Sequence, residues 1–442
     1  MTHQITPDGS PAPAAPPAAH PLTPPRSGVR GRRTPLAYAA GWLATRTVML
    51  LVLVNSGADL LGSGGIPREV HGLYARWAGQ LSAGTFPVGD PLWQYPPGAG
   101  PVLLAPHLVP WLSYFEAFVA LTLLADALVT AALVRAGARP GRSPDGARLW
   151  LFGLPLLLHL PLARYDVQVT AFAVVGLLAL ARSPRTAGAC AALGAAVKGW
   201  PVLTLLGTPP GPDTRRAWTT AAATGGALLV LLAVTFRNPL GFLHEQGARG
   251  VQIESLGGTL LGFARQAGWP GTVRYRYGAM EFVGPYVDAV STASLALTAA
   301  AALLLLVWRL RARHWTPATG FDAALCAVLL FTVTSRVISP QYLVWLLGLA
   351  AVCLTSRRTG QRPVAALVLA ATALSTVIYP VLYAEVTHST WTGCTLLLLR
   401  NGLLVAATAL SFARLWRGTG AAAADAHAKG AAWISGTRST PR

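Results

Sequence analysis

The chain has 442 residues, of which 53% are hydrophobic and only 12% are charged, and its mean hydropathy is +0.48. A soluble domain of this size would need far more charged surface, so the composition excludes a soluble globular protein. The formal net charge is +19, but the basic residues cluster at the ends of apolar segments. That distribution is typical of the positive-inside bias of membrane proteins, and it argues against a nucleic-acid partner.

The apolar stretches are long enough to cross the hydrocarbon of a bilayer, and they recur along the chain. Lipid provides no water to satisfy an open backbone, so the sequence predicts an all-α polytopic membrane protein. Residues 1–35 are rich in proline, alanine and glycine and cannot bury a core, so we expect a disordered cytoplasmic tail. The membrane domain then covers 36–416, and 417–442 form a second loose tail.

The first expected span covers 37–56, with Arg46 near enough to its inner end to snorkel. A long outer loop, 57–113, follows and includes helices that lie along the surface. The segment 186–208 is interrupted at Lys198-Gly199-Trp200-Pro201, which indicates two short helices that meet at an outer break. A second long outer loop covers 237–286. The other expected spans are 114–136, 148–163, 166–182, 217–236, 287–310, 321–338, 341–356, 363–383 and 391–414.

Counting the broken pair as two, this map has about twelve crossings of the plasma membrane, with both termini in the cytoplasm. The unusual polar residues then fall on the outer face, whereas the inner loops carry arginine and little else. The polar set on the outer face consists of Glu69, His71, Asp90, Tyr95, Arg164, Asp166, Lys198, His244, Glu245, Glu254, Arg336 and Gln341. This one-sided distribution predicts an active site at the outer face of the membrane.

Several of these residues also have a plain structural interpretation. Glu69 can be an ordinary solvated loop acid, and Asp166 can cap a helix with Arg164 as its ion partner. Arg336 can anchor a span at the interface. Lys198 stands apart, because ionisable residues in apolar membrane segments are costly and point to function. Its compact ammonium suits a phosphate group.

Some chemistries are disfavoured by missing motifs. The sequence has no Walker-type phosphate loop, no Rossmann glycine fingerprint and no HExxH. It also has no Asp-X-Asp, which argues against a nucleotide-sugar transferase with a bound divalent metal. The expected donor is therefore a lipid phosphate reached from the bilayer, with no cofactor and no metal.

An ordered set of motifs resembles a known family. The set comprises Glu69-Val70 with Tyr74 and Trp77, Trp93-Gln94-Tyr95-Pro96-Pro97, Arg164-Tyr165-Asp166, Lys198-Gly199-Trp200-Pro201, Gln252-Ile253-Glu254-Ser255 and Ser339-Pro340-Gln341-Tyr342-Leu343. Over residues 36–416 the chain resembles the polyprenol-phosphate-mannose-dependent mannosyltransferases of glycosyltransferase family 87, which have the GT-C fold, and its actinobacterial members above all.

The resemblance implies an inverting, metal-independent transfer of mannose from a polyprenyl-phosphate donor to a glycolipid or glycan acceptor. The family's general base is an aspartate in the first outer loop, which matches Glu69 here, with Asp90 as the fallback. The donor phosphate would contact Lys198, Arg336, Gln341 and Arg164, and the sugars would contact Tyr74, Tyr95, Asp166 and Glu254. Some members carry histidine where this chain has Gln341, whose neutral amide adds no charge.

Other functions stay open at this point. A transporter or flippase of a lipid-linked sugar would also use a broken helix, as at Lys198. An arabinofuranosyltransferase of the same fold would differ in the donor sugar, and a scaffold without catalysis would keep the fold alone. The sequence does not identify the acceptor.

Overall fold

The computed structural model describes residues 30–55, 65–87, 89–247 and 249–420, and parts of both expected tails lie outside these ranges. Helices dominate, as the sequence predicts. Six of the described helices are long and apolar enough to cross a membrane. They are α1 (Arg30–Val54), α5 (Tyr114–Gly137), α9 (Pro212–Thr235), α12 (Val287–Arg311), α15 (Arg362–Thr376, extended to Val381 by a further turn, η6) and α17 (Trp391–Thr419). The chain is an all-α polytopic membrane protein.

Shorter helices fill the inside of the bundle. They are α6 (Asp145–Gly153), α7 (Asp166–Ala179), α8 (Pro184–Val197), α13 (Thr319–Thr334) and α14 (Tyr342–Leu354), together with the 3-10 turns η3 (Leu154–Leu157), η4 (Leu160–Ala163) and η5 (Trp200–Gly207). At 1.5 Å per residue none of them spans the hydrocarbon alone. The expected total of about twelve crossings therefore stays a prediction.

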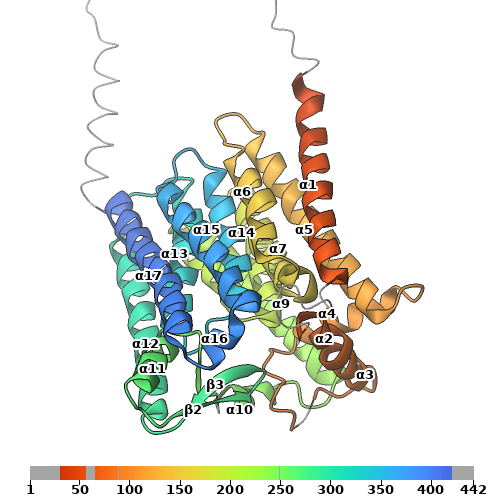
Figure 1. Ribbon diagram of the computed structural model, residues 1–442. Coiled ribbons are helices and arrows are strands. Elements are labelled where there is room, and N and C mark those ends of the chain that lie inside the picture. Colours follow the sequence, from red (N-terminus) through yellow and green to blue (C-terminus); the bar gives the residue numbers. More distant parts are fainter. Residues whose placement is uncertain (1–29, 56–64, 88, 248, 421–442) are drawn as a thin grey trace, which may run out of the picture.

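The two long loops contain short elements that gather at one end of the bundle, whereas α1 begins and α17 ends at the other (Figure 1). The first loop contains α2 (Gly65–Arg68), the π-helix η1 (Glu69–Tyr74), α3 (Ala75–Ser82), α4 (Ala99–Leu104) and η2 (Ala105–Leu108). The second contains α10 (Phe242–Gly247), β1 (Val251–Gln252), α11 (Leu256–Gln266), β2 (Thr272–Arg276) and β3 (Ala279–Val283). This placement of both ends on one side agrees with the map drawn from the arginine-rich loops.

The second loop also contains a small antiparallel sheet, in the order β1-β3-β2, that the sequence analysis did not predict. β2 and β3 are joined by Tyr277 and Gly278, both of which have positive φ (51° and 76°). Positive φ at both turn residues is the condition of a type I′ hairpin, which matches the twist of the strands. The hairpin lies across the loop end of the bundle, beside α10 (Figure 1).

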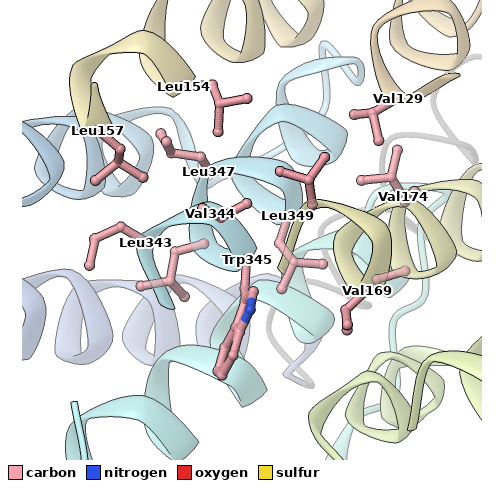
Figure 2. Close-up of a cluster of buried hydrophobic side chains, with 14 of the residues drawn as sticks. Val129, Leu154, Leu157, Val169, Val174, Leu343, Val344, Trp345, Leu347 and Leu349 are labelled. Carbon is pink, nitrogen blue, oxygen red and sulfur yellow. The ribbon is translucent and has the colours of Figure 1, made fainter. Parts of the chain in front are cut away.

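The core of the bundle is centred on α14. Its residues from Leu343 to Leu354 are all buried, because neighbouring helices surround it on every side. Figure 2 shows Leu343, Leu347 and Leu349 of α14 among valines and leucines of other helices, with the ring of Trp345 pointing out of the apolar cluster. A helix that is apolar all round is the expected occupant of such a position. Trp345 thereby connects the core to the polar end of the bundle.

The break near Lys198 forms as the sequence predicts. α8 ends at Val197, Lys198 takes an extended conformation (φ −150°, ψ 118°), and η5 begins at Trp200. Pro201 has no backbone N–H, so it cannot continue the hydrogen-bond ladder back to Val197. Gly98 fixes the Tyr95-Pro96-Pro97 segment against this break, since its N–H donates to the carbonyl of Ala196 (2.9 Å). A Cβ on Gly98 would lie 2.6 Å from that same backbone, so only glycine fits.

Candidate active site

A cavity of about 680 Å³ lies where the loop elements meet the bundle. Its walls come from segments far apart in the sequence, which is how a bundle builds a site from loops and helix ends. Seven of the residues that the sequence analysis singled out line it, namely Glu69, Tyr95, Arg164, Lys198, Glu254, Arg336 and Gln341. Gln94, Gln246, Arg249, Gln252, Tyr275, Tyr342, Trp345, Tyr379 and Tyr383 line it as well.

Glu69 lies at the start of the π-helix η1 and is held by an ion pair with Arg164. Arg164 is 8% exposed, and its Nη1 also donates to the carbonyls of Ala163 (2.9 Å) and Ile66 (3.3 Å). The guanidinium is thus fixed from three directions and orients the Glu69 carboxylate. The side chain of Glu69 remains 26% exposed, so the carboxylate faces the cavity and is not sealed in the wall. π-helical turns of this kind are frequent at functional sites.

The alternative in which Asp166 caps a helix and pairs with Arg164 is wrong. Asp166 is fully buried in the first turn of α7, and its Oδ1 accepts hydrogen bonds from Lys198 Nζ (2.6 Å) and Trp345 Nε1 (2.7 Å). The two neighbouring residues have different partners because Arg164 still has the extended geometry that precedes the helix, whereas Asp166 is already in it. Asp166 also makes no N-cap bond; Tyr165 is the N-cap, without a side-chain hydrogen bond.

Lys198 is enclosed by aromatic rings. Its Nζ lies 4.8 Å from the ring centre of Tyr165, 5.4 Å from that of Trp345 and 5.8 Å from that of Tyr95. Aromatic faces attract a cation at such distances. The rings and Asp166 together fix the ammonium group at the cavity wall. The second oxygen of Asp166, Oδ2, has no hydrogen-bond partner among the described residues.

Arg336 reaches the cavity from the chain between α13 and α14. Its Nη2 donates to the carbonyl of Gln246 (2.5 Å) and its Nη1 to Ser291 Oγ (3.3 Å). No carboxylate of the described residues lies within ion-pair distance of it, which distinguishes it from Lys198 and Arg164. Burial lowers the pKa of Arg336, with the nearby Arg249 acting in the same direction. Because no described carboxylate pairs with Arg336, its positive charge is available to an anion in the cavity.

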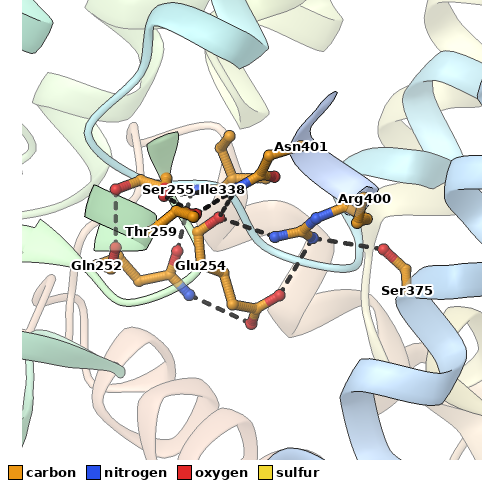
Figure 3. A network of polar contacts seen from close by, with 8 residues as sticks. All are labelled: Gln252, Glu254, Ser255, Thr259, Ile338, Ser375, Arg400 and Asn401. Carbon is orange, nitrogen blue, oxygen red and sulfur yellow. Dashed lines mark hydrogen bonds and ion pairs between the residues drawn. The ribbon is translucent and has the colours of Figure 1, made fainter. Parts of the chain in front are cut away.

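Gln252 holds the segment that carries Arg336. Its backbone N–H donates to the carbonyl of Arg336 (3.0 Å), and its side-chain Oε1 accepts from the N–H of Ile338 (3.0 Å). The remaining Nε2 group points to Glu254 Oε1 (3.4 Å). A single buried residue on β1 thus connects Glu254 to the segment of Arg336, and Figure 3 shows its side chain between Ile338 and Glu254.

Arg400 of α17 is a residue that the sequence analysis missed. It is fully buried, and it contacts Glu254 twice, through Nη1 to Oε2 (3.2 Å) and through Nη2 to the backbone carbonyl (2.8 Å). Asn401 Nδ2 donates to the same carbonyl (3.1 Å), as Figure 3 shows. Burial raises the pKa of the Glu254 carboxyl, an effect that Arg400 opposes. An Arg-Asn pair inside a 29-residue apolar helix is the signal that could have revealed it.

Three predicted residues do not line the cavity. Asp166 lies behind Lys198, and Tyr74 is 1% exposed and packs against Tyr165 and Phe118, so neither can contact a sugar in this arrangement. Asp90 lies away from the cavity wall. Its Oδ2 accepts from Trp77 Nε1 (2.8 Å), and its Oδ1 accepts from the backbone of Leu92 (2.9 Å). The geometry therefore favours Glu69 over Asp90 as the carboxylate that meets a ligand.

Arg46 also differs from the expectation. It does not snorkel but is 1% exposed, and it forms a two-pronged ion pair with Asp126 of α5, from Nε to Oδ2 (2.7 Å) and from Nη2 to Oδ1 (2.8 Å). Trp42 and Trp150 donate to the same two oxygens (2.6 and 2.7 Å). Asp126 offers α1 a partner within the bilayer, so the arginine does not need to reach water.

A second, apolar groove of about 430 Å³ adjoins the cavity. It lies between α8 and α9 and is lined by small and aliphatic residues, with Trp218 on one wall. Val202 and Phe242 line both spaces, so the groove continues the cavity toward the lipid-facing helix α9. Only 17% of the most apolar stretch of that helix is buried against the described residues, as expected for a helix in contact with lipid.

Fold and site together define a polytopic membrane protein with a charged cavity at one end of its bundle and an apolar groove beside it. The chain belongs to glycosyltransferase family 87, whose sequence profile matches residues 93–340, more than half of the chain. Comparisons with curated proteins and with solved structures find no match.

The match confirms the resemblance to glycosyltransferase family 87 and makes the chain a glycosyltransferase by family. The mannose specificity and the actinobacterial type stay predictions. The matched residues include Tyr95, Arg164, Lys198, Glu254 and Arg336. They begin after Glu69 and end just before Gln341, so the importance of these two rests on the geometry of the cavity.

Proposed function

We propose that the protein transfers mannose from a polyprenyl-phosphate-mannose donor to a glycolipid or glycan acceptor at the outer face of the cell membrane, with inversion and without a metal. The observation that carries this proposal is the shared cavity of Glu69, Lys198 and Arg336. Transfer from a glycosyl phosphate needs a base for the acceptor hydroxyl and positive charge for the phosphate that leaves. Both lie in this one cavity.

The reaction is an in-line displacement at C1 of the donor sugar. The acceptor oxygen forms a bond to C1, the bond from C1 to the phosphate oxygen breaks, and its electron pair leaves with the phosphate. Glu69 takes the hydroxyl proton as the new bond forms. Arg164 supports this role by holding the carboxylate in one orientation.

The two cations share the leaving phosphate unequally. The charge of Lys198 is partly compensated by Asp166, at 2.6 Å, whereas Arg336 has no carboxylate partner in the described chain. Arg336 therefore supplies the larger net charge, and Lys198 supplies a fixed donor group. Gln341 adds a neutral amide at the same wall.

The apolar groove supports a lipid-linked donor. A polyprenyl chain is a long hydrocarbon, and the groove between α8 and α9 offers an apolar surface that begins at the cavity, at Val202 and Phe242. The phosphate would then lie near the break at Lys198 with its chain directed toward lipid. Arginine-rich loops at the opposite end of the bundle support an outer location of the cavity and cytoplasmic termini.

The proposal is tested with purified protein in lipid vesicles that contain labelled polyprenyl-phosphate mannose in one leaflet. We expect a new glycosidic bond when a mannoside acceptor is present on the side of the cavity. The break at Lys198 also fits a transporter, which would move the label between leaflets without forming a bond. Movement without bond formation would contradict the proposal, as would transfer of arabinofuranose in preference to mannose.

A further inference from the structure

One wall of the cavity is built from three tyrosines that no part of the proposed reaction uses. Tyr275 comes from β2, Tyr379 from the turn η6 (Val377–Val381) and Tyr383 from the start of α16 (Tyr383–Thr387). The rings of Tyr379 and Tyr383 meet edge to face with 4.8 Å between their centres. Three aromatic rings from two distant parts of the chain thus line the polar cavity.

The turn η6 places Tyr379 in this wall. Tyr379 has an extended backbone (φ −137°, ψ 121°) inside an otherwise helical segment. Proline disfavours helical geometry in the residue before it, and Pro380 follows here. The helix α15 therefore opens at this position, and the side chain of Tyr379 reaches the cavity.

The three tyrosines share the cavity with two carboxylates, Glu69 and Glu254. The pKa of Tyr275 is raised, first by burial and then by the negative charge of Glu69. The pKa of Tyr383 is raised by burial and then by Glu254. Tyr379 lies within electrostatic range of both Glu69 and Glu254. Each phenol hydroxyl can donate and accept a hydrogen bond.

Lys198, in contrast, lies among a different group of rings, those of Tyr95, Tyr165 and Trp345. The cavity thus has one aromatic group around the cation proposed for the donor phosphate and a second that extends toward Glu254. The charge of Glu69 acts on Tyr95 of the first group and on Tyr275 and Tyr379 of the second, so the proposed base lies between the two groups. A base has to face the acceptor hydroxyl, so the ligand that meets the second group is the acceptor.

We propose that Tyr275, Tyr379 and Tyr383 form a subsite for a sugar ring of the acceptor, held between Glu69 and Glu254. This inference rests on the proposed function. The negative face of an aromatic ring suits the polarised C–H groups on one face of a pyranose. The phenol hydroxyls and the Glu254 carboxylate suit its hydroxyl groups. The acceptor is therefore a glycan or glycolipid that already carries sugar, and a bare lipid alcohol or a protein hydroxyl is a poor substrate.

The test measures transfer from labelled polyprenyl-phosphate mannose, with full-length protein in nanodiscs. The acceptors are octyl α-mannopyranoside, octyl β-glucopyranoside and octanol. We expect at least one octyl glycoside to be used far better than octanol. Tyr275→Ala and Tyr379→Ala should each raise the KM for that glycoside about five- to tenfold, the loss expected for one aromatic contact, and leave the KM of the donor unchanged.

Two variants serve as controls. Tyr379→Phe keeps the ring and should have a smaller effect than Tyr379→Ala, and it guards against loss of folding in the alanine variant. Tyr286→Asn changes an exposed tyrosine outside the cavity whose positive φ of 66° asparagine tolerates, so it should behave as the unchanged protein. Tyr275 is 61% exposed on the hairpin, so its removal leaves the bundle intact.

Direct binding separates this inference from the proposed function. Saturation-transfer NMR with methyl α-mannopyranoside should show contact with the unchanged protein and a clear loss in Tyr275→Ala. If this contact is present but no glycosidic bond ever forms, the proposed reaction fails and the sugar subsite stands. If the alanine variants keep the original KM for every glycoside, or if the sugar gives no more signal than glycerol, the subsite is disproved.

Discussion

Two buried ion pairs in this protein have the same chemistry and opposite surroundings. In the pair of Arg46 and Asp126, both carboxylate oxygens accept two hydrogen bonds, with Trp42 and Trp150 completing the set. In the pair of Lys198 and Asp166, one carboxylate oxygen has no partner within the part of the chain that the structure describes, and the ammonium group lies on a cavity wall. Because all its hydrogen bonds are made, the pair of Arg46 and Asp126 acts as a structural link, or staple, between membrane helices. In the pair of Lys198 and Asp166, the ammonium group can still bind a ligand.

The difference has a physical basis. A buried polar group that lacks a partner costs about 1–3 kcal/mol, so an incomplete pair persists only where something else compensates for it. The unpartnered atom is Asp166 Oδ2, which does not line the cavity, whereas the Lys198 ammonium bonded to the other oxygen meets three aromatic rings and the cavity. We attribute the compensation to these contacts of the ammonium group. The following predictions, in order of decreasing effect, test whether this contrast is correct.

The largest effect is expected at Glu69, the carboxylate that meets the cavity while held by Arg164. Glu69→Gln keeps the size of the side chain but removes the base, so the rate of transfer should fall about 10²- to 10⁴-fold. Donor binding, measured by equilibrium dialysis with labelled polyprenyl-phosphate mannose, should change little. Asp90→Asn is the matched control, because Asp90 lies outside the cavity, and it should remain active. The reverse ranking of the two variants would reassign the base to Asp90.

The staple is tested next. Asp126→Asn leaves Arg46 buried without its counter-charge, which should destabilise the protein by about 3–5 kcal/mol and lower the midpoint of thermal unfolding in detergent. The double change Arg46→Met with Asp126→Leu removes both charges, so it should recover most of the stability and leave the KM values unchanged. Loss of activity in a double variant that is stable would show that this pair also acts in the site.

Replacing both charges of the cavity pair, Lys198 and Asp166, should affect activity and not stability. Lys198→Met with Asp166→Leu also removes both charges, so the fold should be kept, as judged by the thermal midpoint. Transfer should nevertheless fall about 10²-fold in kcat/KM, since a donor group for the leaving phosphate is lost. A fully active double variant would contradict the conclusion that the pair of Lys198 and Asp166 serves the ligand while the pair of Arg46 and Asp126 serves the fold.

The smallest effect is expected at Gln252, which holds the segment of Arg336 without being charged itself. Gln252→Met has a similar length but cannot accept the hydrogen bond from Ile338, so the position of Arg336 becomes less defined. We expect the KM of the donor to rise about tenfold, in line with the cost of one unpaired backbone group. The thermal midpoint should change little. Gln80→Met, on the exposed face of α3, is the control and should leave the KM as it was.

The sequence predicted the features that depend on neighbouring residues. The long spans follow from continuous apolar stretches, and the break at Lys198 follows from Gly199 and Pro201. It did not predict which charges pair, because Glu69 and Arg164 are 95 positions apart and only the folded bundle brings them together. The Arg164 to Asp166 pair was an inference from adjacency, and it is wrong because the start of α7 turns the two side chains to different partners.

Two further elements were missed for different reasons. The hairpin of β2 and β3 has a short signal, Tyr277-Gly278 between alternating residues, that is weaker than the apolar pattern around it. Arg400 and Asn401 stood in an apolar helix, a costly position that generally marks a polar partner. That partner is the Glu254 loop, from another part of the chain.

The hairpin also bears on how such an enzyme diversifies. Residues 272–283 are anchored by strand pairing and by the buried side chains of Glu281 and Phe282, whereas their turn, Tyr277-Gly278, lines the cavity. Insertions or substitutions in that turn disturb no membrane helix, since loops accept sequence changes that packed helices do not. Under the proposed function, the donor and acceptor sides of the cavity can therefore change separately in evolution. Substitutions in the twelve residues of the hairpin would alter the choice of acceptor, while the bundle would keep the lipid donor.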